Sequence, residues 1–116
     1  MIEIKKLMDE MNSVQGVMGS GVVSKDGRPV EMRLPQELSQ ETISIMAATV
    51  YGAACTLHSE AKKTLPGSIS IKTNGCETHI YDVGKRTLAA VMTCEGFDTA
   101  QLRPYIDRLS AEFGKN

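Results

Sequence analysis

Apolar residues return every three or four positions in three segments of the chain, residues 2–13, 39–65 and 97–113. This spacing places them on one side of an amphipathic helix, so we predict a helix over each segment. The long segment begins at a serine suited to be an N-cap and stops before Pro66 and Gly67. It is the element around which the rest of the chain is expected to be organised.

The long helix is expected to have two apolar faces. One is a stripe of core residues that should lie on a sheet, namely Ile43, Met46, Ala47, Val50, Ala54, Leu57 and Ala61. The opposite face consists almost entirely of small residues, namely Ile45, Ala48, Gly52, Cys55 and Ser59. Glycine inside a helix lowers its stability by about 0.5–1 kcal/mol relative to alanine, so a small residue at Gly52 suggests a close contact there. Either the back face is simply exposed or, as we favour, a second helix approaches it and forms a subunit interface.

Between the helices, apolar residues alternate with polar ones, which is the pattern of strands. Residues 17–34 are predicted to fold into a hairpin about the turn dipeptide Asp26-Gly27. This turn sets two opposed pairs, Val23 with Val30 and Gly21 with Met32. Gly19 and Gly21 thin one face of the first strand and leave room for something bulky to cross it. Pro29 lacks a backbone N–H, so the second strand should lie at an edge of the sheet.

Three further strands are predicted between residues 68 and 94, with turns at Asn74-Gly75 and at Gly84-Lys85-Arg86. The last strand, 87–94, is apolar on both faces, so it should be covered on both sides and lie centrally in the sheet. Strand 68–73 has one polar face, as expected nearer an edge. The tight hairpins make the sheet largely antiparallel, and the order of helices and strands predicts one α+β domain over residues 1–116.

The composition fits one ordinary domain. A chain of 116 residues supports a single core, and 41% apolar with 23% charged residues is not the composition of a disordered chain. The net charge of −1 gives no basic excess to neutralise phosphates, so nucleic acid is not an expected partner. No apolar run approaches the roughly 20 residues of a membrane span, and residues 1–11 are too charged for a secretory signal. The three cysteines, Cys55, Cys76 and Cys94, favour free thiols in a reducing cytoplasm.

Residues that usually carry catalysis or bind cofactors do not form a recognisable pattern. The sequence has no GxxxxGK[ST] loop, and Gly19-Ser20-Gly21 lacks the third glycine of a dinucleotide loop. His58 and His79 stand alone, without the spacing of a zinc site. We therefore expect no catalytic residue, no cofactor and no metal, and a protein that is not an enzyme. The arginines are scattered and expected to be solvated, namely Arg28, Arg33, Arg86, Arg103 and Arg108.

One cysteine pair has a specific geometric expectation. If Gly84-Lys85-Arg86 is a three-residue turn, Val83 opposes Thr87 and, counting outward, Cys76 opposes Cys94. Directly opposed strand residues have Cβ atoms about 4.5–5.5 Å apart, near the reach of a disulfide. Two interpretations stay open, a redox-sensitive bridge or two reduced thiols packed as small hydrophobic residues. A reducing compartment favours the second.

Three stretches of the sequence carry a resemblance to a known family. They are the glycine-bearing first strand and turn VMGSGVVSKDGRPV, the alanine-rich helix TISIMAATVYGAACTLHSEA, and GSISIKTNGCETHIYDVGKRTLAAVMT with its hairpin and buried strand. In these stretches and in the order of its elements, the chain resembles the Roadblock / dynein light chain superfamily, in its prokaryotic MglB-like branch of small-GTPase regulators. The resemblance covers the whole chain as a single Roadblock-like domain, 1–116.

The resemblance implies a profilin-like fold, with a five-stranded antiparallel sheet of order 2-1-5-4-3, the long helix on one face and the two terminal helices on the other. It also implies a homodimer, formed through the middle helix and through the third strand, which pairs with its symmetry mate. Carried onto this chain, the dimer interface would comprise Ile45, Ala48, Gly52, Cys55, Ser59, Ser68, Ile69, Ser70, Ile71, Lys72 and Thr73. Members of the family bind Ras-like small GTPases and regulate GTP hydrolysis, or act as scaffolds and cargo adaptors. The resemblance assigns no residue to the GTPase contact.

The function we expect is a homodimeric, non-enzymatic interaction module that binds and regulates, or scaffolds, a cytoplasmic Ras-like small GTPase. Two alternatives stay open. One is a small-molecule sensor domain of the profilin-like or PAS-like type, for which Gly19 and Gly21 leave room, although few aromatic or convergent polar residues are available to orient a ligand. The other is a purely structural adaptor dimer without effect on nucleotide turnover.

Overall fold

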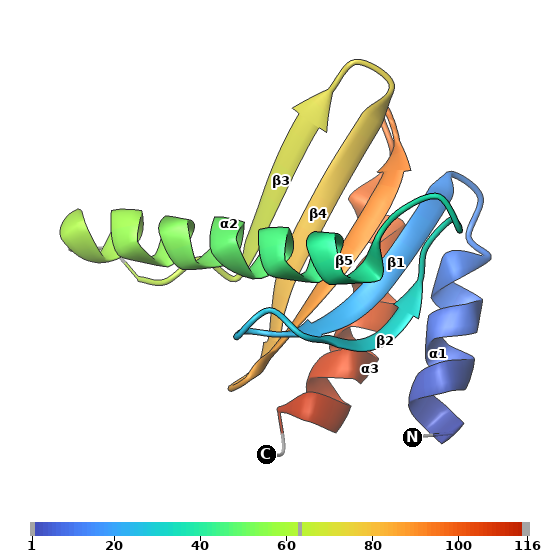
Figure 1. Cartoon of the computed structure of the whole chain (residues 1–116), viewed down its shortest axis with the longest axis horizontal. Coiled ribbons are helices and arrows are strands. Elements are labelled where there is room, and N and C mark those ends of the chain that lie inside the picture. Colours follow the sequence, from blue (N-terminus) through green and yellow to red (C-terminus); the bar gives the residue numbers. More distant parts are fainter. Residues whose placement is uncertain (1, 63, 115–116) are drawn as a thin grey trace.

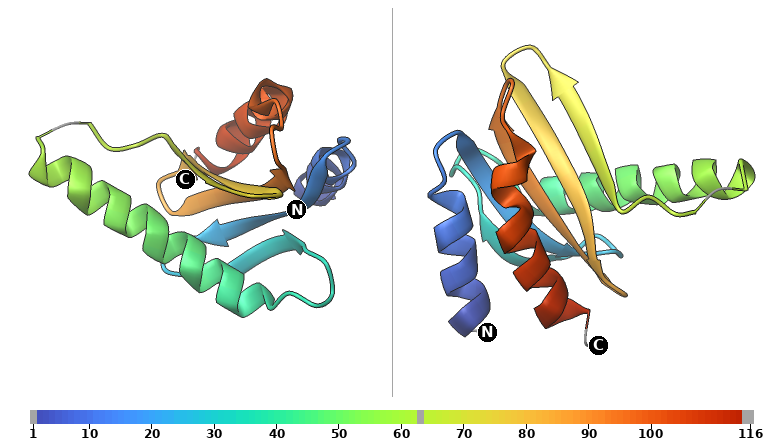
Figure 2. Two further views of the ribbon diagram at one scale, coloured as in Figure 1. Left: turned by 90° about the horizontal axis from the view of Figure 1, so that it is seen from above. Right: turned by 180° about the vertical axis from the view of Figure 1, so that it is seen from behind.

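Helix α2 lies on one face of a five-stranded sheet, and helices α1 and α3 lie on the other (Figure 1, Figure 2). The computed structural model describes residues 2–62 and 64–114. All strand pairs are antiparallel, and the strand order is β2-β1-β5-β4-β3. The predicted α+β fold and its strand order are therefore confirmed.

The elements follow one another along the chain as predicted. The helices are α1 (Ile2–Asn12), α2 (Gln40–Glu60) and α3 (Arg103–Phe113), and a short 3₁₀ turn, η1 (Thr99–Leu102), precedes α3. The strands are β1 (Val17–Ser24), β2 (Pro29–Arg33), β3 (Ser68–Thr73), β4 (Cys76–Gly84) and β5 (Thr87–Cys94). Gly27 and Gly75 have φ angles of 94° and 93°, which glycine adopts without strain, so both predicted turn dipeptides are confirmed. Pro104 lies in the first turn of α3, where its missing N–H breaks no helical hydrogen bond.

The β1–β2 hairpin has the predicted turn but not the predicted register throughout. Gly21 opposes Met32 as expected. A bulge then pairs Val23 with Pro29, so the expected Val23–Val30 pair is wrong. The space left by Gly21 is filled from within the hairpin, because a Cβ there would stand only 2.6 Å from the Met32 sulfur.

The β4–β5 hairpin shows a similar local difference. Its closing pair is Gly84 with Thr87, because a bulge lies at the turn end, and the expected Val83–Thr87 pair is wrong. The bulge does not affect the rest of the ladder. Cys76 lies directly opposite Cys94, as predicted.

The sheet separates two hydrophobic cores. The larger lies under α1 and α3 and includes Leu7, Met8, Met11, Val22, Val91, Leu102, Ile106 and Leu109. The smaller lies under α2 and consists of Val23, Ala47, Tyr51, Ile80, Leu88 and Ala90. Strand β5 contributes to both cores, which confirms its central position.

Helix α2 begins where predicted and ends earlier. Ser39 is its N-cap, because the hydroxyl accepts a backbone N–H of the first turn at 3.1 Å. The last helical residue is Glu60 and not Leu65, since Lys62 takes a φ of 58°, which a right-handed helix cannot contain. Ala61, expected in the core stripe, therefore lies outside the helix and is exposed.

Helix α2 crosses the sheet at an angle, and its C-terminal half projects past β3 (Figure 1, Figure 2). The predicted core stripe is wrong in part for two reasons: the side of α2 that meets the sheet carries Ser44, Ala47 and Tyr51, and the projecting half has no sheet beneath it. Ala47 is buried as expected, whereas Met46 and Leu57 are 50% and 67% exposed. Ser44 and Tyr51, which were not in the predicted stripe, are buried instead.

Candidate interaction surface

An apolar groove runs between α2 and the part of the sheet that α2 leaves uncovered. Its wall is formed by Ile43, Met46 and Val50 of α2, and its floor includes Ile71 of β3 and Met92 of β5. The groove has a volume of about 170 Å³. We call these five residues the α2–β3 groove. It extends toward the β3–β4 turn, because Ile71 and its strand partner Thr78 line it.

The apolar wall of this groove continues along α2 beyond the sheet. Ile43, Met46, Val50 and Leu57 are spaced by three, four and seven residues, which keeps them on one side of a helix. We call these four residues the apolar stripe of α2. Leu57 lies in the half of the helix that projects past β3. Exposed apolar side chains gathered in this way are typical of a surface that another protein covers.

The small-residue face of α2, predicted to form the dimer contact, points in a different direction. Ile45, Gly52 and Ser59 are exposed, Ala48 is half-buried, and Cys55 packs partly against the α2 core. Ile45 lies beside the β1–β2 turn, where a Cβ on Gly27 would stand 3.5 Å from its Cα. Among the described residues, no heavy atom lies within 4 Å of a Cβ built on Gly52. At Ile45 this face is therefore turned toward the β1–β2 turn, and at Gly52 it is open.

Strand β3 forms one edge of the sheet, as its polar face predicted. Ile69 is half-buried against the α2 core, and the other residues of the strand are exposed, namely Ser68, Ser70, Ile71, Lys72 and Thr73. Gly67 directly precedes this strand, and its carbonyl accepts the N–H of Asp82 at 2.9 Å. Because backbone groups alternate in direction along a strand, the odd-numbered residues of β3 direct theirs toward β4. The even-numbered residues, Lys72 among them, direct theirs outward. In the described part of the chain these outward groups have no partner strand.

A polar cluster built on two buried residues, Glu77 and His79, fastens β3 to β4 on the other face of the sheet. The Ser70 hydroxyl lies 2.8 Å from His79 Nδ1, and His79 Nε2 lies 3.2 Å from a Glu77 carboxylate oxygen. The second oxygen of Glu77 accepts the N–H of Gly96 at 2.9 Å. Burial lowers the pKa of His79 below its usual 6.5, and this outweighs the Glu77 carboxylate, which raises it.

The order serine, imidazole and carboxylate is that of an acyl-transfer site, but such a site also needs donors for an oxyanion. The Gly96 amide that points into the cluster already donates to Glu77. We therefore interpret the cluster as a structural clamp. Sequence reasoning missed it, although Glu77 and His79 stand two apart on a strand and thus share the face that buries Tyr81 and Val83.

A polar contact at Tyr51 holds α2 on the sheet. The Tyr51 hydroxyl donates to Asp82 Oδ2 at 3.0 Å and also lies 3.2 Å from the carbonyl oxygen of Pro66. Lys25 Nζ approaches the other carboxylate oxygen of Asp82 at 2.9 Å. Burial is the main cause that raises the pKa of Tyr51, followed by its hydrogen bonds to Cys55 and Asp82. The phenol therefore stays protonated and fixes the crossing point of the helix.

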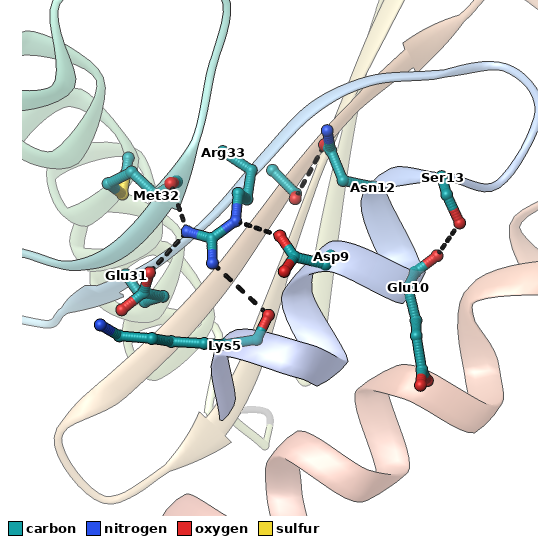
Figure 3. Close-up of polar contacts among 9 residues, drawn as sticks. Lys5, Asp9, Glu10, Asn12, Ser13, Glu31, Met32 and Arg33 are labelled. Atoms are coloured by element: carbon teal, nitrogen blue, oxygen red, sulfur yellow. Dashed lines mark hydrogen bonds and ion pairs between the residues drawn. The ribbon is translucent and has the colours of Figure 1, made fainter. Parts of the chain in front are cut away.

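Arg33 joins the opposite edge of the sheet to α1 (Figure 3). Its Nε donates to Asp9 Oδ1 at 2.6 Å, and its Nη1 donates to Glu31 and to the carbonyl of Met32. The Asp9 and Glu31 carboxylates raise the pKa of this guanidinium. The expectation that Arg33 is solvated is therefore wrong, because the guanidinium finds partners on two elements.

Within residues 2–62 and 64–114, no three His, Cys, Asp or Glu side chains come together as metal ligands would. Among the helices that the structure describes, none is long and apolar enough to cross a membrane.

The family model for the Roadblock/LC7 domain matches residues 3–93 of the chain. Two uncharacterised proteins of Methanocaldococcus jannaschii are 27% and 26% identical to the chain over 113 residues. Each alignment covers 95% of this chain, and they cover 96% and 99% of the two relatives.

Solved structures share the fold at low sequence identity. MglB of Myxococcus xanthus has a TM-score of 0.86 at 16% identity, over 97% of this chain and 93% of that one. A Roadblock/LC7 domain from Streptomyces avermitilis has a TM-score of 0.83 at 15% identity, over 93% and 92%. Schizosaccharomyces pombe profilin has a TM-score of 0.64 at 12% identity, over 93% and 94%. These likenesses confirm the profilin-like architecture.

Such a fold and family match define a small regulatory interaction module. The chain belongs to the Roadblock/LC7 domain family, whose members are generally regulatory and not enzymatic. The family identified from the three sequence stretches is thereby confirmed.

Proposed function

We propose that this protein is a homodimeric, non-enzymatic module that binds and regulates, or scaffolds, a cytoplasmic Ras-like small GTPase. Membership of the Roadblock/LC7 family and the resemblance to its MglB-like branch support the partner class. The observation that carries the homodimer is the exposed surface formed by the α2–β3 groove and the unpaired edge of β3. One solved structure in the fold group is described as MglB with a tetrameric arrangement, so self-association occurs in a protein of this fold.

The proposed dimer joins two β3 strands about a two-fold axis. An open edge pairs readily with another strand, and two copies of one edge can satisfy each other's outward backbone groups. The two-fold rotation that pairs the β3 strands also brings the projecting half of each α2 toward the α2–β3 groove of the other copy. We therefore propose Ser68 to Thr73 and the apolar stripe of α2 as the dimer contact. The small-residue face of α2, whose Ile45 lies beside the β1–β2 turn, is then not the centre of this contact.

Pairing through β3 has a direct test in Lys72, whose backbone N–H points outward. Lys72→Pro removes this N–H at an edge position where proline is tolerated within its own sheet. Lys72→Ala is the matched control, because it removes the same side chain and keeps the N–H. We expect Lys72→Pro to weaken the dimer in sedimentation velocity and Lys72→Ala to leave it unchanged. Equal dimerisation of both variants contradicts pairing through β3.

The partner class is tested with Ras-like GTPases encoded in the same genome. Each GTPase is loaded with GDP or with a non-hydrolysable GTP analogue, and binding to the protein is measured by calorimetry. We expect binding that depends on the nucleotide, and a changed rate of single-turnover GTP hydrolysis. Absence of binding in both nucleotide states refutes the proposed partner. Binding without any change in hydrolysis supports the structural adaptor dimer instead of a regulator.

The small-molecule sensor has less support from the structure. The α2–β3 groove, at about 170 Å³, is smaller than the roughly 300–1,000 Å³ of most ligand pockets. The space beside Gly19 is occupied, since a Cβ there would stand 3.1 Å from Pro35 and 3.3 Å from Leu34. A thermal-shift screen of metabolites tests this alternative directly.

A further inference from the structure

Cys76 and Cys94 face each other across the β4–β5 ladder, at the end of the sheet near the Asn74-Gly75 turn. Both carry free thiols, and Cys94 is exposed while Cys76 is half-buried. An oxidant in solution therefore reaches at least one of the two sulfurs. The third cysteine, Cys55, packs against the α2 core. It lies on helix α2 and not on the β4–β5 ladder, so it is not paired with either of the other two.

Backbone hydrogen bonds show which kind of opposed pair this is. The N–H of Cys94 donates to the carbonyl of Gly16 at 2.8 Å, so this residue directs its backbone groups toward β1. Asp82 directs its N–H to Gly67, at the start of β3. Cys76 is, like Asp82, an even-numbered residue of β4, so it also directs its backbone groups toward β3 and not toward β5. Cys76 and Cys94 therefore exchange no hydrogen bond with each other. In such pairs the Cα atoms lie about 4.5 Å apart, which is the closest approach in an antiparallel sheet.

This separation has consequences for a disulfide. Disulfides span Cα distances of about 4.4–6.8 Å, so the pair falls within the range but at its short end. Cys94 is exposed, and exposed bridges are among the readily reduced ones. A bridge here would thus be reversible and not a permanent part of the fold.

Side-chain hydrogen bonds hold the two strand ends together around the pair. The N–H of Gly75 donates to a Glu95 carboxylate oxygen at 2.7 Å, and the N–H of Gly96 donates to Glu77 at 2.9 Å. Each bond links one end of β4 to the segment after β5, so the cysteines stay opposed. The Cys94 sulfur lies toward Gly16, 3.2 Å from where a Cβ there would stand. Rotation about one bond of this exposed side chain turns it toward Cys76.

We infer that Cys76 and Cys94 are a redox modification site that forms a reversible cross-strand disulfide by exchange with a low-molecular-weight disulfide. The thiolate of Cys94, the more accessible sulfur, attacks one sulfur of the small disulfide and releases the first small thiolate. The thiolate of Cys76 then attacks the Cys94 sulfur of the mixed disulfide and releases the second. Two protein thiols are oxidised, one small disulfide is reduced to two small thiols, and the two protons pass to these products. This inference does not depend on the proposed dimer or on a GTPase partner.

The test treats the full-length wild-type protein with oxidised glutathione, alkylates the remaining thiols and maps them by mass spectrometry. We expect one alkylated thiol, at Cys55, and a peptide pair cross-linked through Cys76 and Cys94. Because the second thiol is held at an effective concentration of millimolar or more, the bridged form should exceed the mixed disulfide at least about tenfold. An excess of reduced glutathione should restore all three thiols without unfolding the protein.

Several results would overturn the inference. They are three alkylated thiols after oxidation, a mixed disulfide at Cys94 that persists in the wild-type protein, a bridge that includes Cys55, and a bridge between two chains. Persistence of the bridge in excess reduced glutathione contradicts its reversible character. Cys76→Ser provides a further check, since Cys94 should then stop at the mixed disulfide. The wild-type map decides the matter even if this variant folds poorly.

Discussion

Leu57 offers a direct way to ask which side of α2 forms the self-contact. Its side chain is 67% exposed in the projecting half of the helix, so it contributes little to the fold of one copy. Leu57→Gln keeps a similar length and a similar helix propensity. We therefore expect the monomer to be as stable as the wild type and the dimer to be weaker.

The size of the effect follows from the exposed fraction. Burying a whole leucine side chain is worth about 1.5–3 kcal/mol, so the exposed two thirds of Leu57 hold about 1–2 kcal/mol. A two-fold dimer contains this contact twice, which doubles the loss to about 2–4 kcal/mol. Since each 1.4 kcal/mol is tenfold in affinity, the dissociation constant should rise by about 30- to 700-fold.

The measurement is a dilution series followed by sedimentation equilibrium, with thermal unfolding of each variant as the check on the fold. Ile45→Gln is the matched control, because Ile45 is 50% exposed on the same helix but lies on the side of the β1–β2 turn. We expect little change in its dissociation constant. If Ile45→Gln weakens the dimer and Leu57→Gln does not, the small-residue face is the contact and the reasoning from the groove is wrong. If neither variant has an effect, α2 is not part of a self-contact.

Three further predictions concern the fold itself. Gly84→Ala places a Cβ 2.7 Å from the backbone oxygen of Phe113, so α3 must shift. Urea unfolding should show that the free energy of unfolding falls by about 1–3 kcal/mol. An unchanged urea midpoint would show that α3 moves aside without loss of stability. Arg33→Met removes the ion pair to Asp9 and should lower the free energy of unfolding by about 1 kcal/mol. Amide hydrogen exchange should then become faster in α1 than in α3. A uniform increase along the chain would argue against a local link between Arg33 and α1. Because burial depresses the pKa of His79, the unfolded chain binds the proton more readily. The contribution of His79 to the free energy of unfolding should therefore be constant above about pH 7.5 and fall below about pH 6.5. His79→Gln should remove this part of the pH dependence, and an identical profile in the variant would assign it to other groups.

Local signals predicted most of the fold. The turn dipeptides at residues 26–27 and 74–75 depend on glycine conformations that few other residues adopt, and both turns form. The last strand is apolar on both faces, a property that only a covered strand needs, and it lies in the centre of the sheet. The strand order came from the family resemblance and is confirmed. The bulges in the β1–β2 and β4–β5 hairpins were missed because a single extra residue leaves no mark in an alternating pattern.

The candidate surface was predictable only in part. Periodicity identifies the apolar positions of α2, but it does not tell which of them will face the sheet or which part of the helix will have a sheet beneath it, so Met46 and Leu57 were placed in the core. Tyr51 was overlooked because its core neighbours and its hydrogen-bond partner Asp82 come from strands far away in the sequence. Arg33 and His79 were missed for the same reason, since their partners come from other elements. The residues of β3 were placed correctly at an edge, while their role in a dimer stays a prediction.

The strand order has a consequence for how the protein is made. Strands β1 and β2 form one local hairpin, β3 and β4 form another, and β5 alone joins the two by pairing with both β1 and β4. A growing chain that has not yet produced residues 87–94 therefore holds two half-sheets without a shared ladder, each with an open edge and an uncovered apolar face. Pairings between distant segments slow folding, and such open intermediates are prone to aggregate. The central strand is also the last of the five strands to be synthesised, so the sheet closes only after both hairpins have been made.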